Sequence, residues 1–437
     1  MSSLGNTTNS RGSAQTEEIS IVTLRKVTWR VIPFLFVLYV IAWLDRVNVS
    51  FAGLQMNADL GFSSTVFGLG SGIFFLGYCL FEIPSNIILE RVGARLWISR
   101  IMVTWGLISA AMMFVRTPAA FYLLRFLLGV AEAGFFPGVI YYLSLWYPVA
   151  HRARAIAAFM TAVPVTGLIG APLSGALLEL DSLHGLAGWQ WLFLLEGIPA
   201  VILGAGVLFY LKDRPETAQW LRPEERNWLI ETLAAERKAR VRTPGIRVAL
   251  TDFNVWKLGL IFLLVAAGFY GYSFWAPLVI KSLTGLRNFT VGLVLGAISA
   301  VTIAGMLLNS YHSDRTGERA VHTAVPLFVM GIGLMGSAWL HQPVMVIIAL
   351  ALVPLGHCGS YGPFWSTPTQ FFTGRAAAAG IALVTMIANI GSFAGPTLIG
   401  FMKARTGTHT AAFSLLGVLA ILAALLALQL RTRSIQN

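Results

Sequence analysis

Long apolar segments and short polar stretches alternate along the whole chain. Six apolar segments precede a polar stretch in the middle, at residues 29–52, 65–89, 97–115, 119–146, 155–178 and 190–211. Six more follow it, at residues 255–280, 290–311, 323–341, 344–371, 376–401 and 410–430. A helix of about 20 apolar residues spans the hydrocarbon core of a bilayer. The pattern therefore predicts an all-α membrane protein with twelve transmembrane helices in two six-helix bundles.

The polar stretches divide the chain into five parts. We expect a polar tail at 1–28, a bundle at 29–211, a linker at 212–254, a bundle at 255–430 and a second tail at 431–437. The linker carries prolines and charges of both signs, and the sequence from Arg222 onward predicts an amphipathic surface helix. We expect this linker to lie along one membrane face, and a docking site for a regulatory partner is the alternative.

Basic residues are concentrated on one side of the expected membrane. With the amino terminus placed in the cytoplasm, 23 of the 31 Lys and Arg residues fall in cytoplasmic segments and five on the opposite side. Cytoplasmic loops of membrane proteins are rich in Lys and Arg. We therefore expect a multi-pass protein of the inner (plasma) membrane with both termini in the cytoplasm. The first apolar segment is too long for the core of a signal peptide, so it is expected to be a retained helix.

Composition excludes several classes of protein. Apolar residues make up 56% of the chain and charged residues 11%, which is far from a soluble domain. The net charge of +12 is dispersed over loops, so it does not predict nucleic-acid binding. Both cysteines fall in apolar segments and indicate no disulfide framework. We find no phosphate-binding loop, metal-ligand cluster or nucleophile triad, so we expect no enzyme activity, no cofactor and no metal. Nothing in the sequence demands more than a monomer.

Four charged residues lie in the interiors of the first and fourth apolar segments. Arg125 and Glu132 lie two helical turns apart on one face, and Asp45 and Arg46 interrupt the first segment close to Asn48. Charges inside a membrane are costly unless they find partners or face a water-filled cavity. One interpretation is a structural ion pair that locks two helices together. Two acids and two bases in two segments favour the other interpretation, which is a transport site.

A short charged motif occurs at corresponding places in the two halves. Glu90 and Arg91 begin an acid-Arg-x-Gly-x-Arg sequence after the second segment, and Asp314 and Arg315 begin the same sequence after the eighth. An acid at a helix end, with arginines in a tight turn, can form charge-assisted bonds to a neighbouring helix end. We expect these loops to act as gates that stabilise the outward-facing form.

The duplicated motif over twelve segments resembles the major facilitator superfamily. More narrowly, the chain resembles its anion:cation symporter family, and among these the bacterial tartrate, sugar-acid and hydroxylated aromatic-acid permeases. The stretches that carry the likeness are residues 44–52, 81–95, 125–138, 312–319 and 374–382. The resemblance covers nearly the whole chain after residue 25. It implies the major facilitator fold and proton-driven uptake of small organic anions through a central site between the two halves.

The resemblance also implies roles for individual residues. Asp45 and Glu132 match the acids that couple protons, and Arg46 matches an arginine that binds the substrate carboxylate or pairs with an acid. Arg125 matches the fourth-segment arginine that holds Glu132 or senses its charge. The further matches are polar positions that contact substrate or line the cavity: Asn48, Tyr78 and Asn389.

The chain departs from the family pattern in three places. Glu90 stands where aspartate is usual, Ala94 stands where the wider superfamily often has arginine, and the sequence around Asn389 differs from that of relatives. The seventh segment has no arginine, which argues against a dicarboxylate gripped from both halves.

The second half has a different chemical character from the first. The interiors of its six segments contain no acidic residue, so carboxyl-based coupling is expected in the first half. Tyr272 and Ser366 are expected to contact the hydroxyls or ring face of a substrate. We interpret four other titratable residues as packing or interface groups: Glu82, Glu196, His312 and His357.

Together these features predict a proton-coupled symporter that imports a small organic carboxylate by alternating access. Tartrate, a sugar acid and a hydroxylated aromatic acid all fit one arginine with hydroxyl and aromatic neighbours. The expected partners are this anion, protons and the lipid bilayer. A sodium-coupled carrier or an exchanger of the same anions is the alternative within transport, and an anion channel is the alternative from another class.

Overall fold

The computed structural model describes residues 5–239, 251–366 and 374–430, and all regular structure in these stretches is helical. The first half contains α1 (Gly5–Asp59), α2 (Ser64–Val92), α3 (Ala94–Ala111), α4 (Pro118–Glu132), α5 (Phe135–Trp146), α6 (Val149–Met160), α7 (Ala162–Leu177) and α8 (Gly188–Tyr210). The middle contains α9 (Pro223–Ala239). The second half contains α11 (Phe253–Thr284), α12 (Asn288–Thr316), α13 (Ala320–Trp339), α14 (Pro343–Ser366), α16 (Gly374–Thr406) and α17 (Thr410–Leu428).

Among the described residues, twelve stretches of helix are long and apolar enough to cross a membrane, which confirms the expected number. Two of them are each built from two helices, α4 with α5 and α6 with α7. Four parts of the expected organisation lie outside the described residues: 1–4 of the first tail, 240–250 of the linker, the end of the tenth segment beyond Ser366 and the whole second tail at 431–437.

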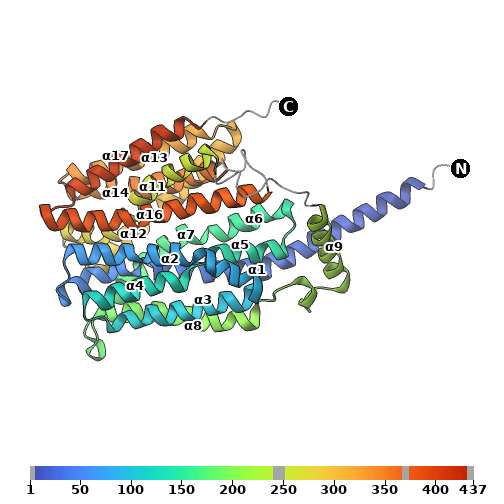
Figure 1. Ribbon diagram of the computed structural model, residues 1–437, viewed down its shortest axis with the longest axis horizontal. Coiled ribbons are helices and arrows are strands. Elements are labelled where there is room, and N and C mark those ends of the chain that lie inside the picture. Colours follow the sequence, from blue (N-terminus) through green and yellow to red (C-terminus); the bar gives the residue numbers. More distant parts are fainter. Residues whose placement is uncertain (1–4, 240–250, 367–373, 431–437) are drawn as a thin grey trace.

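The helices form two bundles that lie side by side along their lengths. Helices α1 to α8 pack with one another, as do helices α11 to α17, and the two groups meet where α2 contacts α16, α7 contacts α12 and α1 contacts α11. Figure 1 shows the first bundle in blue and green below the second in yellow and red. Helix α1 begins at the same end of the molecule as α9, which we call the α9 end.

The bundles approach most closely at the opposite end. A Cβ atom added at Gly68 of α2 would lie 2.6 Å from the Pro396 carbonyl oxygen of α16, and one at Gly175 of α7 would lie 2.6 Å from the Asn288 carbonyl oxygen of α12. Small residues let helices pack this closely inside a membrane. The bundles are therefore closed against each other at the end opposite α9.

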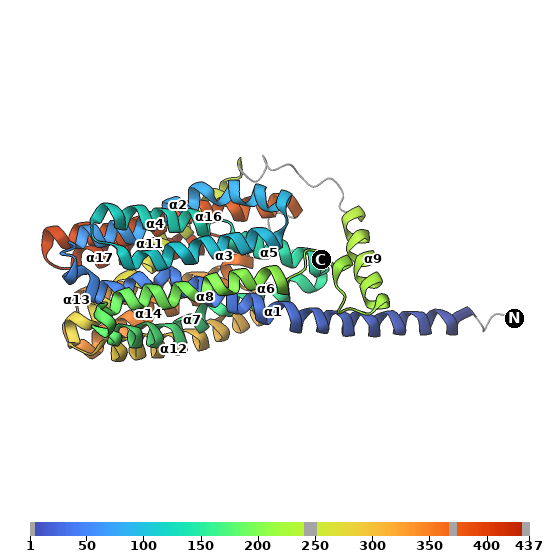
Figure 2. The ribbon, with the colours of Figure 1, turned by 90° about the horizontal axis from the view of Figure 1, so that it is seen from below.

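The first helix is longer than expected. The sequence predicts a polar tail before residue 29, but α1 is one helix from Gly5 onward. Its first proline is Pro33, so no residue before this point removes a helical hydrogen bond. At the α9 end, Lys26 donates to Glu225 of α9 at 2.6 Å. Figure 2 shows α9 packed across α1 where that helix leaves the bundle. The predicted surface helix after Arg222 is confirmed.

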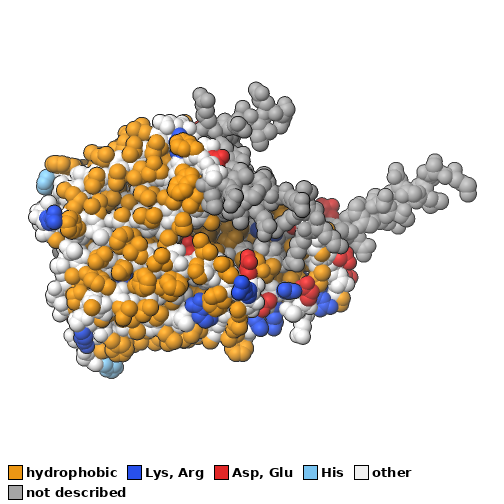
Figure 3. All heavy atoms as spheres, in the orientation of Figure 1, with side chains coloured by type: hydrophobic (Ala, Val, Ile, Leu, Met, Phe, Trp, Pro, Cys, Tyr) orange, Lys and Arg blue, Asp and Glu red, His pale blue; other side chains and the backbone are white. Residues whose placement is uncertain are grey.

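The surface agrees with a membrane-spanning body. Figure 3 shows apolar side chains over the middle of the molecule, whereas charged side chains gather at the α9 end and, more sparsely, at the opposite end. Exposed large apolar residues such as Leu123, Ile202 and Leu308 lie in the middles of helices. A lipid environment would cover this belt.

Candidate binding site between the two bundles

A cavity of about 330 Å³ lies between the bundles, in the half of the molecule nearer the α9 end. We call it the central cavity. Its wall is formed by Tyr39, Trp43, Arg46, Phe74, Phe75, Tyr78, Glu82, Phe136, Ile156, Met160, Phe262, Ala266, Tyr270, His357, Tyr361, Trp365, Ile381, Thr385, Ala388, Asn389 and Ser392. Both bundles contribute, so the cavity has the position expected of a substrate site between two moving halves.

The guanidinium of Arg46 is the positive charge in the described wall of this cavity. Arg46 Nε donates to Glu132 Oε1 at 3.1 Å, and Arg46 Nη2 donates to the same oxygen. The rings of Trp43, Phe74 and Tyr78 surround this guanidinium, with centroids 5.1, 5.6 and 5.4 Å away. The Glu132 residue is 1% exposed, so this ion pair is shielded from water and strengthened by its surroundings.

A break in the fourth membrane-spanning helix, between α4 and α5, places Glu132 at the end of α4. The next residue but one, Gly134, has a φ of +88°, which favours glycine, and it separates α4 from α5. Ser85 on α2 donates to the carbonyl of Ala133 at 2.6 Å, so the break is held by a hydrogen bond to a neighbouring helix. Glu132 can therefore reach across to Arg46 on α1.

Arg125 has a different environment from the one its sequence position implies. Its Nε and Nη2 donate to the backbone carbonyls of Gly70 and Ser71 on α2, at 3.2 and 3.3 Å. Glu132 is paired with Arg46 instead. The reason is geometric, because seven residues along a helix correspond to about 10 Å of rise, whereas α1 lies beside Glu132. Arg125 therefore fastens α4 to α2 and lies outside the described wall of the central cavity.

Asp45 also lies away from the central cavity. It is 1% exposed and accepts hydrogen bonds of 2.7 Å from Trp105 Nε1 and Ser109 Oγ, both on α3. Asn48 donates to it at 3.3 Å within the same internal cluster. Successive residues of a helix point about 100° apart, so Asp45 and Arg46 face different neighbours. The acid is directed into the first bundle, whereas the arginine lines the central cavity.

The other predicted binding residues are divided between several places. Tyr78 and Asn389 line the central cavity, one from each bundle. Tyr272 lines a second cavity of about 150 Å³, which we call the side cavity. Ser366 donates to the carbonyl of Pro363 on its own helix.

The two repeated loops lie at the α9 end. Glu90 and Arg91 line a polar surface cavity of about 490 Å³, together with Asp213 and residues of α9. Asp314 pairs with Arg319 of its own loop at 2.7 Å, and Arg315 is exposed. Within the described residues, neither loop forms an ion pair across the two bundles.

Sequence reasoning missed or undervalued several wall residues. Glu82, taken as a packing group, lines the central cavity, as does His357, whose Nε2 lies 3.1 Å from the Tyr361 hydroxyl. Tyr270 of α11 is a neighbour of Arg46 from the opposite bundle. The sequence does contain a pattern that indicates part of this wall. On α1, Tyr39, Trp43 and Arg46 are spaced so that they lie on one face of the helix.

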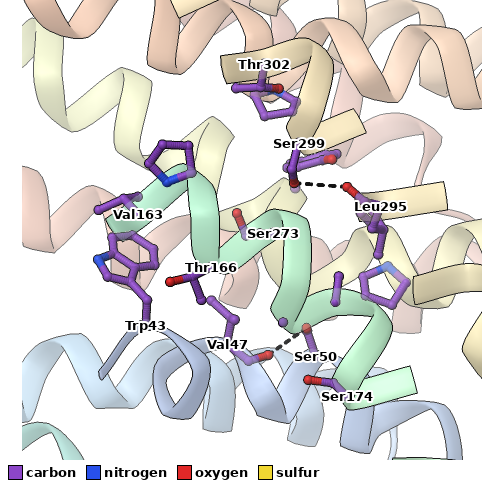
Figure 4. Close-up of a pocket in the computed structure, with 18 of the residues that line it drawn as sticks. Trp43, Val47, Ser50, Val163, Thr166, Ser174, Ser273, Leu295, Ser299 and Thr302 are labelled. Carbon is purple, nitrogen blue, oxygen red and sulfur yellow. Dashed lines mark hydrogen bonds between the residues drawn. The ribbon is translucent and has the colours of Figure 1, made fainter. Parts of the chain in front are cut away.

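The side cavity lies on the other side of Trp43, toward the end opposite α9. Helices α1, α7, α11, α12 and α14 surround it. Figure 4 shows hydroxyl groups around it, with Ser50 donating to the Val47 carbonyl and Ser299 to the Leu295 carbonyl. Its wall is otherwise mostly apolar. Trp43 lines both cavities.

Comparison with known proteins identifies the family. Residues 35–396 match the model of the Major Facilitator Superfamily. The chain belongs to the major facilitator superfamily. A "Putative tartrate transporter" of Agrobacterium vitis is 49% identical over 420 residues, which is 96% of this chain and 93% of that protein. A "Putative metabolite transport protein NicT" of Pseudomonas putida is 44% identical over 390 residues, 89% of each chain.

Solved structures of this superfamily share the fold. A bacterial homologue of the human lysosomal transporter Spinster, in an inward-facing and occupied conformation, has a TM-score of 0.74 at 18% identity, covering 92% of this chain and 96% of that chain. A D-xylose-proton symporter has a TM-score of 0.72 at 15% identity, covering 92% and 97%. This major facilitator protein is therefore a multi-pass membrane transporter and not an enzyme, and the resemblance to the anion:cation symporters is confirmed.

Proposed function

We propose that this transporter imports a small organic carboxylate together with protons, by alternating access, across a bacterial inner membrane. The observation that carries the proposal is the Arg46–Glu132 ion pair beside the central cavity. It brings a carboxylate-binding cation and a titratable acid to one place. The relatives named as tartrate transporters support an organic anion as the substrate.

The ion pair links anion binding to protonation. A guanidinium presents a planar fork that matches a carboxylate, but here Glu132 occupies it. Leaving one partner of a buried pair without its counter-charge costs about 3–5 kcal/mol. The substrate carboxylate and ionised Glu132 therefore compete for Arg46. Protonation of Glu132 neutralises the competitor and releases Arg46, so anion and proton bind together.

The arrangement of the bundles supports alternating access. The bundles are closed against each other at one end by close helix contacts, and the central cavity lies toward the other end. With the α9 end in the cytoplasm, as the distribution of basic residues favours, this is an inward-facing arrangement. We propose that the bundles at 29–211 and 255–430 rock about the central site, with 212–254 as the linker between them, in a monomer.

The gating loops belong to the same proposal. In an arrangement closed at the opposite end, a latch formed at the α9 end would be open, and the local Asp314–Arg319 pair agrees with this. We propose that Glu90, Arg91, Asp314 and Arg315 form contacts between helix ends in the outward-facing form.

The cavity wall favours a carboxylate with a flat apolar face. Ten of the 21 wall residues are Phe, Tyr or Trp, which suits ring stacking better than a small, densely hydroxylated acid. We propose Arg46 for the carboxylate, with Tyr78, Asn389 and Tyr270 for polar groups on the ring. Arg125, Asn48, Tyr272 and Ser366 then act from outside this wall.

The decisive experiment is uptake by purified protein in proteoliposomes. We expect an acid-outside gradient to drive accumulation of the substrate and a protonophore to abolish it. Accumulation that needs sodium would support the sodium-coupled alternative, and unitary currents would support a channel. The substrate is found first by a thermal-shift screen of organic acids, in which ring-bearing carboxylates are expected to stabilise the protein more than tartrate does.

A further inference from the structure

A second acidic cluster lies inside the first bundle. Glu196 on α8 is 3% exposed, and its Oε1 accepts a hydrogen bond of 2.7 Å from Ser174 Oγ on α7. Asn48 on α1 neighbours Glu196 and also donates to Asp45 Oδ1 at 3.3 Å. One amide therefore links two buried carboxyl groups, and neither carboxyl lies in the wall of the central cavity.

Two acceptor atoms of this cluster lack hydrogen-bond partners among the described residues: Glu196 Oε2 and Asn48 Oδ1. An unsatisfied buried polar atom costs about 1–3 kcal/mol. A proton on Glu196 Oε2 would turn this oxygen into a donor, and Asn48 Oδ1 is an acceptor in the same cluster. The arrangement is therefore suited to a protonated Glu196, and it becomes unsatisfied when that proton leaves.

The charges around the cluster reinforce this point. The charged group that faces Glu196 is Asp45 from α1, while α7 contributes Ser174. Asp45 in turn faces Glu132 and Arg125 from α4, and α3 contributes Trp105 and Ser109. Glu196 thus has no ion-pair partner within the described residues, and another acid is beside it. Like charges in close proximity favour a proton on one of them.

The side cavity reaches this cluster at Ser174. Ser174 lines the cavity and at the same time donates to Glu196. Figure 4 shows Ser174 at the edge of the cavity, with the hydroxyls of Ser273, Ser299 and Thr302 also lining it. A cavity of about 150 Å³ with these hydroxyls has room for several water molecules. It lies toward the end opposite α9, which in the proposed orientation is the outside.

We propose that Glu196 is a second proton-carrying carboxyl of this transporter, loaded from the side cavity through Ser174. This inference rests on the proposed proton coupling. In the loading step, a hydronium ion transfers a proton to Ser174 Oγ and becomes water, while Ser174 transfers its own hydroxyl proton to Glu196 Oε1. One O–H bond breaks and one forms at the serine, and the carboxylate becomes neutral. Rotation of the carboxyl group about its Cγ–Cδ bond then exchanges the two oxygens, so that the protonated one can donate to Asn48 Oδ1. Release passes the proton back through Ser174 to water once alternation of the bundles has opened the side cavity toward the α9 end, so that the proton leaves on the other side of the membrane.

The test is the dependence of accumulation on the pH gradient in proteoliposomes. A difference of one pH unit corresponds to about 1.4 kcal/mol per coupled proton, or about tenfold in the accumulation ratio. Glu196→Gln preserves the shape and the hydrogen bond from Ser174 but cannot exchange a proton. We expect its accumulation ratio at a one-unit gradient to be about tenfold below that of the parent, with counterflow of labelled substrate continuing. Accumulation equal to that of the parent would overturn the proposal.

The serine provides an independent test should Glu196→Gln fail to fold. Ser174→Ala removes the relay hydroxyl, so we expect slower initial uptake under the gradient, and Ser174→Thr should restore the rate. Ser337→Ala, a buried serine of the second bundle bonded to its own helix, is the matched control. Equal rates for Ser174→Ala, Ser174→Thr and the control would overturn the relay. If the parent shows no gradient-driven accumulation, the proposed function itself fails.

Discussion

Arg287, at the start of α12, donates a hydrogen bond of 2.7 Å to Glu179, which follows α7. This ion pair joins the two bundles at the end opposite α9. The side chain of Arg287 is 80% exposed, so water screens the pair and it contributes on the order of 0.2–1 kcal/mol. It biases the closed arrangement of this end but does not lock it.

Removing this pair is expected to open the end opposite α9 to a measurable extent. Glu179→Gln should lower the ratio of molecules closed to molecules open at that end by up to about fivefold, because a fivefold change in this ratio corresponds to about 1 kcal/mol. Pulsed electron–electron double resonance between spin labels at positions 116 and 405, in place of Arg116 and Arg405, would measure the proportions of molecules open and closed at this end. The charge-reversed double variant, with Glu179→Arg and Arg287→Glu, should return toward the parent distribution. Identical distributions for Glu179→Gln and the parent would contradict a bridging role.

The close helix contact at Gly68 is expected to be essential for closing the same end. In Gly68→Ala the new methyl group would meet the Pro396 carbonyl at 2.6 Å, so α2 and α16 must separate. Gly206→Ala on α8 is the control, because no atom lies within 4 Å of the added carbon and alanine favours a helix by about 1 kcal/mol. We expect Gly68→Ala to slow counterflow and Gly206→Ala to leave it unchanged. Equal counterflow rates in the two variants would contradict the claim that the contact at Gly68 is essential for closing this end.

The two interior arginines are expected to respond differently to substitution by lysine. Lysine keeps the charge but loses the planar fork, so Arg46→Lys should weaken substrate binding by about tenfold or more. Arg125 instead holds two backbone carbonyls of α2, so Arg125→Lys should lower the melting temperature with a smaller effect on affinity. Ligand-induced thermal shifts measure both quantities. Parent-like affinity in both variants would place the carboxylate site elsewhere.

The contact between α1 and α9 is expected to depend on pH. Burial raises the pKa of the Glu225 carboxyl, but hydrogen bonds from Lys26 and from the Arg222 backbone lower it, and its net pKa lies below the ordinary value. A depressed folded-state pKa stabilises the contact above the unfolded value of about 4.3, and this stabilisation is lost as the pH falls through the lower folded value. The protection factors of the α9 amides, which are corrected for the intrinsic pH dependence of exchange, should therefore fall in acid, and less so in Glu225→Gln, whose protection is already low at neutral pH. If the protection of α9 in the parent did not change with pH, this dependence on the Lys26–Glu225 contact would be contradicted.

The sequence predicts the helices well because each is a long apolar segment with an unmistakable pattern. Three of the binding residues that it predicts line the central cavity: Arg46, Tyr78 and Asn389. It cannot tell which interior charge faces which neighbour, since Asp45 and Arg46 are adjacent and their directions depend on helix rotation. The fold decides that Asp45 faces α3.

Other parts of the site depend on contacts between distant segments. The pairing of Glu132 with Arg46 rather than Arg125 follows from the position of α1 beside the break at Gly134. The contribution of Glu82 to the wall follows from the packing of α2 against both bundles. Helical spacing alone contains no information on such contacts.

The central claim is that the charge of Glu132 couples proton movement to the binding of an anion at Arg46. Glu132→Gln permanently mimics the neutral acid and leaves Arg46 available to the substrate. Counterflow and concentrative uptake are measured side by side in the same proteoliposomes, the latter under an imposed acid-outside gradient. The account predicts that counterflow of labelled substrate persists, because it needs no net proton movement, and that concentrative uptake is lost. Concentrative uptake equal to that of the parent would contradict it.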